Sequence, residues 1–61
     1  MTKRQMIAEM MEGLRYPNNE KVLENRCKAK LSRVQEVYNH YQKTNKTRED
    51  KLFCINLLVV W

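Results

Sequence analysis

The chain has 61 residues, with one Gly, one Pro, two Cys and one His, and it carries 12 Lys+Arg against 7 Asp+Glu, for a formal net charge of +5. This length allows a single domain over residues 1–61 and excludes a doubly wound or barrel enzyme. Two cysteines and one histidine also exclude a disulfide-dense miniprotein and a zinc finger. At 43% hydrophobic residues, the composition is that of a folded chain rather than a disordered tail.

The small size of the chain limits the stability that its own core can supply. A domain of about 60 residues buries only about 60% of the surface that its unfolded chain exposes. The apolar burial then roughly balances the conformational entropy lost on folding. Because the sequence shows no set of disulfides or metal ligands, we expect self-association or a partner to supply further stability.

The first predicted helix covers residues 2–15. Thr2 and Gln5 match a capping box, in which the two side chains satisfy each other's backbone N–H groups. From Met6 to Leu14, apolar residues recur at the spacing of one helical face. The sequence Pro-Asn-Asn at positions 17–19 then predicts a loop.

A second, long helix is predicted over residues 19–43. Because such a helix is longer than the first, we expect part of its apolar seam to be free for a second chain. The seam residues step by four or three positions, which is close to a heptad pattern. They are Leu23, Cys27, Leu31, Val34, Tyr38 and Tyr41.

A third helix is predicted to begin after the Thr-Asn-Lys-Thr loop at positions 44–47. Thr47 and Asp50 match a second capping box. The β-branched C-terminal residues also leave open a strand, which would need a partner's sheet edge. We expect the helix, and hence an all-α, small three-helix domain (helix–PNN loop–long helix–TNKT loop–helix) that forms a dimeric helical bundle.

The sequence shows no catalytic set. Cys27 and His40 lie 13 positions apart on one predicted helix, where they cannot meet. Carboxylate pairs such as Glu20 and Glu24 have lysines nearby and are typical of solvated helix charge. There is no recurring metal-ligand spacing and no glycine-rich phosphate loop. We therefore expect no enzymatic activity, no cofactor, no metal site and no small-molecule substrate.

Basic residues form a stripe at i, i+4 and i+7 on the long predicted helix, with Val37 on the same strip. Such a stripe contacts nucleic-acid phosphates or an acidic protein surface, or it is simply solvated. Helices that read bases usually expose Asn, Gln and Arg after a turn that contains Gly, which neither predicted loop provides. The stripe and its extension in the second loop give these candidate contacts: Arg26, Lys30, Arg33, Lys46 and Arg48.

The C-terminal run 54–61 is apolar on nearly every side, broken only by Asn56. A three-helix monomer can bury one face of this run but not its whole circumference, and exposed apolar surface usually marks an interface. Together with the seam of the long helix, it gives a predicted partner or dimer interface of Leu31, Val34, Tyr38, Tyr41, Phe53, Leu57, Leu58 and Trp61.

The sequence also carries expectations about location and function. Cys27 and Cys54 are interpreted as reduced thiols, the first 15 residues show no secretory signal, and the C-terminal run is too short to span a bilayer. We therefore expect a cytoplasmic protein with no membrane contact. The predicted function is that of a non-catalytic regulatory or accessory protein, such as an inhibitor, which binds a protein partner as a homodimer. The alternative is a basic regulator that binds DNA or RNA.

Overall fold

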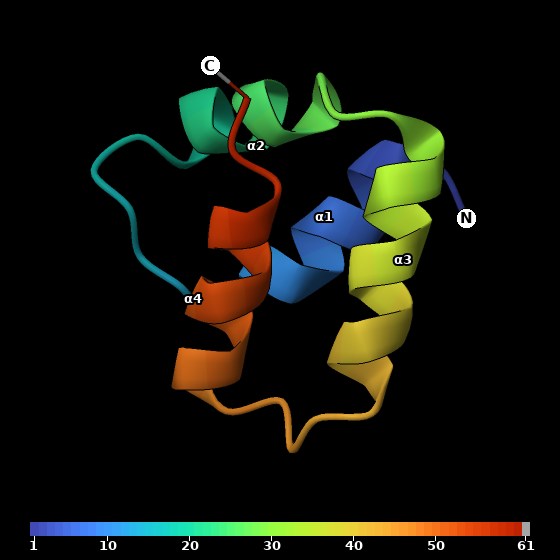
Figure 1. The fold of residues 1–61 in the computed structure, drawn as a ribbon. Helices are drawn as coiled ribbons and strands as arrows, with labels where there is room; N and C mark the ends of the chain where they lie inside the picture. The colour runs from blue at the N-terminus through green and yellow to red at the C-terminus, as the bar shows by residue number, and fades with distance from the viewer. Residues whose placement is uncertain (61) are drawn as a thin grey trace.

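Four α-helices follow one another in the computed structural model, which describes residues 1–60 (Figure 1). Their bounds are Lys3–Met11 (α1), Asn19–Cys27 (α2), Leu31–Gln42 (α3) and Arg48–Leu57 (α4). The helices α3 and α4 run antiparallel, α1 packs against both, and α2 packs on α1 across one end of the pair (Figure 1). The predicted all-α class is confirmed, and as far as Val60 the C-terminal run does not form the alternative strand.

Both predicted capping boxes are confirmed. The Thr2 hydroxyl accepts from the Gln5 N–H at 3.1 Å, and the Gln5 side chain accepts from the Thr2 N–H at 2.8 Å. Thr47 and Asp50 make the same reciprocal pair at the start of α4. The first helix ends earlier than predicted, at Met11, because Gly13 takes a φ of +85° that only a residue without a Cβ adopts readily.

The long helix predicted over residues 19–43 is wrong, because the chain forms two helices there instead of one. The turn between them consists of Lys28, Ala29 and Lys30. The Ala29 N–H donates to the Arg26 carbonyl three residues back at 3.1 Å, which tightens the end of α2. Lys30 is extended, with φ −63° and ψ 146°, and serves as the N-cap of α3.

Packing against α1 explains this break. A straight helix over residues 19–43 would be about 37 Å long, whereas the molecule measures 26 × 26 × 20 Å. Breaking the helix lets both halves pack against the nine residues of α1. The apolar seam shifts its phase at the break, so Val37, which was predicted to lie on the basic strip, is buried, and Leu31 of the predicted seam is exposed.

The C-terminal segment is fixed by side chains of α2. Beyond α4, Leu58 is the C-cap residue, and Val60 returns toward α2. The Asn25 side chain donates to the Val60 carbonyl at 3.0 Å and accepts from the Val60 N–H at 3.2 Å. Trp61 lies outside the described residues, and so does its predicted role.

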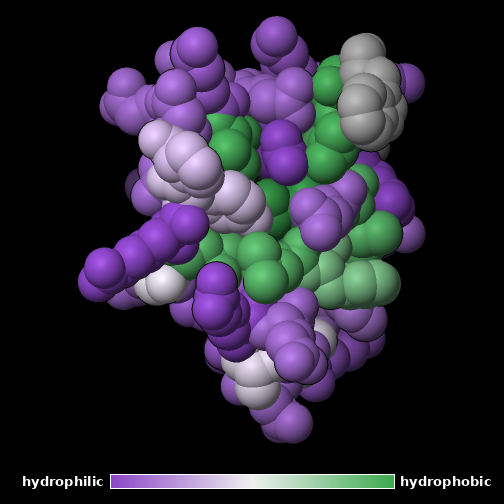
Figure 2. Space-filling view, turned by 90° about the vertical axis from the view of Figure 1, so that its left-hand side faces the viewer, coloured by the Kyte–Doolittle hydropathy of each residue, from purple (hydrophilic) through white to green (hydrophobic). Residues whose placement is uncertain are grey.

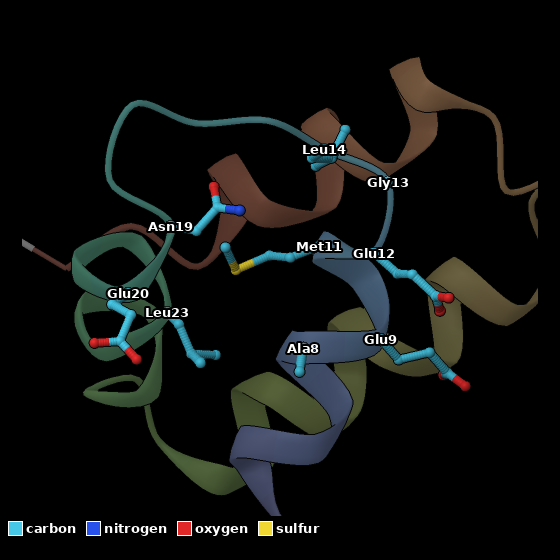
Figure 3. Close-up of a pocket in the computed structure, with 9 residues that line it drawn as sticks. All are labelled: Ala8, Glu9, Met11, Glu12, Gly13, Leu14, Asn19, Glu20 and Leu23. Atoms are coloured by element: carbon cyan, nitrogen blue, oxygen red, sulfur yellow. The ribbon is translucent and has the colours of Figure 1, made fainter.

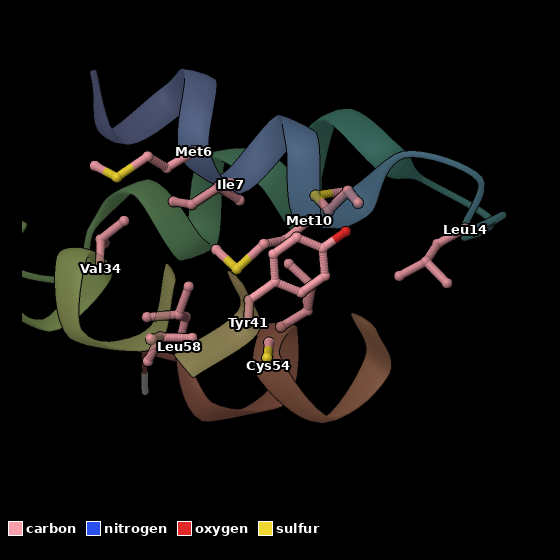
Figure 4. Close-up of a cluster of buried hydrophobic side chains, with 11 residues drawn as sticks. Met6, Ile7, Met10, Leu14, Val34, Tyr41, Cys54 and Leu58 are labelled. Carbon is pink, nitrogen blue, oxygen red and sulfur yellow. The ribbon is translucent and has the colours of Figure 1, made fainter. Parts of the chain in front are cut away.

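A single hydrophobic cluster fills the space between the helices (Figure 4). The methionines of α1 belong to this core rather than to the surface, and the aromatic ring of Tyr41 reaches in from α3. No polar or charged side chain of residues 1–60 is buried in it. Its members are Met6, Ile7, Met10, Met11, Leu14, Val34, Val37, Tyr41, Cys54, Ile55 and Leu58.

Candidate functional site

The reactive side chains lie apart from one another. Cys54 is fully buried in α4, and burial raises the pKa of its thiol, so the unreactive neutral form predominates at neutral pH. Cys27 is half-buried on α2, and His40 is exposed on α3. Within residues 1–60, no cluster of His, Cys, Asp and Glu could hold a metal ion.

The predicted basic stripe does not exist as one helix face. Arg26 belongs to α2, Lys30 to the turn and Arg33 to the first turn of α3. The Arg26 guanidinium is also engaged inside the molecule, because its Nε atom donates to the Ile55 carbonyl at 3.2 Å. The same carbonyl accepts from the Leu58 N–H at 3.1 Å, so Arg26 adds a second, charge-assisted bond near the end of α4. Arg26 is therefore a structural residue.

The other basic candidates project from the two ends of α3. Lys28 and Lys30 are exposed in the α2–α3 turn, and the Lys3 ammonium donates to the Ala29 carbonyl between them at 3.0 Å. At the opposite end, Lys43 follows the last residue of α3 and is exposed. Lys46 and Arg48 are exposed just beyond it, where the chain enters α4. Apart from Arg33 in its first turn, these cations flank α3 rather than line it.

The residues predicted for a partner interface separate into buried and exposed groups. Val34, Tyr41 and Leu58 are at most 3% exposed and belong to the core, so they offer no surface to a partner. Tyr38 is half-buried, and its ring packs beside that of Tyr41 with centroids 6.4 Å apart. The exposed members are Leu31, Phe53 and Leu57.

Two of these exposed members, Phe53 and Leu57, line a shallow groove between α3 and α4. Val37 reaches this groove from α3, and the Phe53 ring packs on the His40 imidazole at a centroid distance of 6.0 Å. Arg33 and Glu36 line the groove as well, with 3.8 Å between their charged groups. Seen from the side of α4, hydrophobic side chains reach the surface in a band bordered by hydrophilic ones (Figure 2).

A larger hollow, of about 490 Å³, lies between α1 and the beginning of α2. Met11, Leu14 and Leu23 give it an apolar lining (Figure 3). Glu9 and Glu12 also line it, but their carboxylates point away from Leu23 (Figure 3). Sequence reasoning missed this hollow, because it depends on the turn that Gly13 makes after α1.

Comparison with known proteins identifies no relative. No family model matches the chain, and no curated protein or solved structure matches it either. Across residues 1–60, none of the helices has the length and apolar character needed to cross a bilayer. The function is therefore inferred from the surfaces of this chain.

Proposed function

We propose that the chain is a non-catalytic regulatory protein that pairs with a second copy of itself and binds a macromolecular partner in that form. The exposure of Phe53 carries this proposal, because its aromatic side chain is 56% exposed although the chain has a well-filled core beside it. Leu57 lies one helical turn further along α4 and is 37% exposed. Aromatic side chains are enriched at protein interfaces, and a second chain would remove both residues from water.

The charges beside the groove support a second copy as the occupant. In a two-fold dimer the same patch meets itself, so each residue faces its counterparts in reversed order. Arg33 and Glu36 lie three positions apart on α3 with opposite charges. A two-fold axis that passes between these two residues places the Arg33 of one copy near the Glu36 of the other, and like charges then do not oppose each other.

The side chains that line the groove support a regulatory rather than a catalytic role. The groove presents apolar and charged side chains but no activated nucleophile, since Cys54 lies in the core. We place this role in the cytoplasm, where a free half-buried thiol such as Cys27 stays reduced. A protein partner that the dimer regulates is the simplest reading of this surface.

Light scattering coupled to size exclusion tests the pairing. The wild-type chain is expected to elute with the mass of a dimer, and Phe53→Ser with the mass of a monomer. Leu31→Ser is the matched control, because Leu31 is 48% exposed but does not line the groove. A wild-type monomer at all concentrations, or a Leu31→Ser variant that dissociates as readily as Phe53→Ser, would contradict the proposal.

Nucleic-acid binding is a second candidate, and the break in the predicted long helix favours it. The break creates a short helix, a tight turn and a second helix, which is the order of elements in helix-turn-helix proteins. The turn contains Lys28 and Lys30 but no glycine, and so differs from the common form of that motif. Filter binding to duplex DNA and to single-stranded RNA at low and moderate salt tests this candidate, because phosphate contacts weaken steeply with salt. Absence of binding to both at low salt would eliminate it.

A further inference from the structure

We propose that the polar face of α3 enters the major groove of double-stranded DNA. This inference rests on the second candidate function and names the element and the kind of nucleic acid. Ser32, Gln35, Glu36 and Asn39 are all exposed on α3. In a helix with 3.6 residues per turn, these four positions lie within about 100° of one another. They form one continuous face with hydrogen-bonding side chains and no apolar residue.

The side chains of this face are suited to reading base edges. The amides of Gln35 and Asn39, which do not line the groove between α3 and α4, can each pair with the N6 and N7 atoms of adenine. Helices that read bases usually expose Asn, Gln and Arg. The phase of α3 exposes the first two of these residue types on this face, because it turns Val34 and Val37 inward.

The position of α3 in the fold leaves this face accessible. The helix lies at an edge of the molecule, with α1 and α4 against its other sides (Figure 1). Val34, Val37 and Tyr41 are at most 3% exposed, so the helix is held rigidly on the core. A helix with its side chains is about 10–12 Å across, which matches the width of about 12 Å of the major groove.

The flanking cations lie where the phosphates of the two strands would be. Lys30 is the N-cap residue of α3 and Lys43 its C-cap residue. The twelve residues of α3 lie between them, so the two lysines are about 20 Å apart along the helix axis. Each lysine is therefore available to the phosphates that border the groove at one end of the helix. Lys28 adds to the charge at one end, and Lys46 and Arg48 add to it at the other. The charge of this edge therefore complements that of a DNA duplex.

Fluorescence anisotropy with a labelled random-sequence duplex of about two helical turns, and with the single strand of the same length, tests this inference. The wild-type chain is expected to bind the duplex about tenfold more tightly than the single strand at low salt. Lys30→Ala combined with Lys43→Ala should weaken duplex binding about tenfold and reduce its salt dependence. Lys21→Ala is the matched control, because Lys21 is an exposed lysine in the first turn of α2, away from the α2–α3 turn, and this change should leave the affinity within about twofold.

Selection from a pool of randomised duplexes tests the base contacts separately. The wild-type chain should enrich a short common sequence, and Asn39→Ala should bind that sequence about tenfold more weakly while binding the random duplex as before. Equal affinity for duplex and single strand would overturn the placement of α3 but leave nucleic-acid binding intact. Absence of binding to either probe at low salt would overturn both the placement of α3 in the major groove and nucleic-acid binding itself. The face of α3 would then remain a protein-binding surface.

Discussion

The Nε atom of Arg26 donates a hydrogen bond to the Ile55 carbonyl at 3.2 Å, and this bond joins α2 to the last turns of α4. The same guanidinium donates to the Asn25 side chain at 2.9 Å. Asn25 in turn forms two hydrogen bonds with the backbone of Val60. These neighbouring residues of α2 therefore hold the C-terminal part of the chain in place.

Replacing Arg26 by Ala should lower the free energy of unfolding by about 2 kcal/mol, because the charge-assisted hydrogen bonds to the Ile55 carbonyl and to the Asn25 side chain are lost. Urea unfolding followed by circular dichroism measures this change. Arg33→Ala is the matched control and should change stability by less than about 0.5 kcal/mol, because Arg33 is half-exposed in a loose surface ion pair. Equal effects of the two substitutions would contradict a structural role for Arg26.

Tyr16 offers a substitution that should stabilise the fold. Its hydroxyl is buried without a hydrogen-bond partner among the described residues, although the ring packs against the core. Tyr16→Phe removes that unsatisfied group and should raise the free energy of unfolding by about 1 kcal/mol. The control is Tyr38→Phe, whose hydroxyl is at the surface, where it contacts the Met1 sulfur at 3.4 Å and can bond to water, so its loss should matter little. A Tyr16→Phe variant less stable than wild type would show that the hydroxyl has a partner in solution.

Stability should decrease at alkaline pH. Burial raises the pKa of the Tyr41 phenol above its ordinary value of 10.0, and that of the Cys54 thiol above 9.0. Because the folded chain binds these protons more tightly than the unfolded chain, their contribution is complete below about pH 9 and is lost as the pH rises through the raised values. Urea unfolding between neutral pH and pH 11 should show constant stability up to about pH 9 and a decline above it.

The combined variant Cys54→Ala and Tyr41→Phe checks the cause of this decline. It lacks both buried groups, so its stability should fall less steeply with pH than that of wild type, although its stability at neutral pH is lower. An identical slope for the variant and the wild type would assign the decline to other groups.

Local signals allowed the starts of α1, α2 and α4 to be predicted, whereas tertiary packing determined the end of α2 and the start of α3. The capping boxes at Thr2 and Thr47 depend on side chains three residues apart, so the sequence alone reveals them. The break between α2 and α3 carries no Gly or Pro. The break arises because α1 is short and both apolar segments pack against it. This tertiary packing overrides the helical propensity of residues 28–30.

The candidate surfaces were predictable only in part, for the same reason. Phe53 and Leu57 were both predicted for an interface, Leu57 because the C-terminal run is too apolar for one helix face, and both are exposed. Arg26 was expected at the surface, but the break turns it toward α4. The groove and the polar face of α3 depend on the shift in helix phase at the break between α2 and α3. A pattern read as one continuous helix cannot predict that shift.

The central claim is that two copies of the chain meet through the groove between α3 and α4. Isotope-filtered NMR on a refolded mixture of carbon-13-labelled and unlabelled chains tests it most directly, because only contacts between copies produce filtered cross-peaks. The account predicts cross-peaks from the Phe53 ring and the Leu57 methyl groups to residues of the partner copy. A spectrum without cross-peaks, or one in which they arise from Leu31 and Met1 instead, would contradict it.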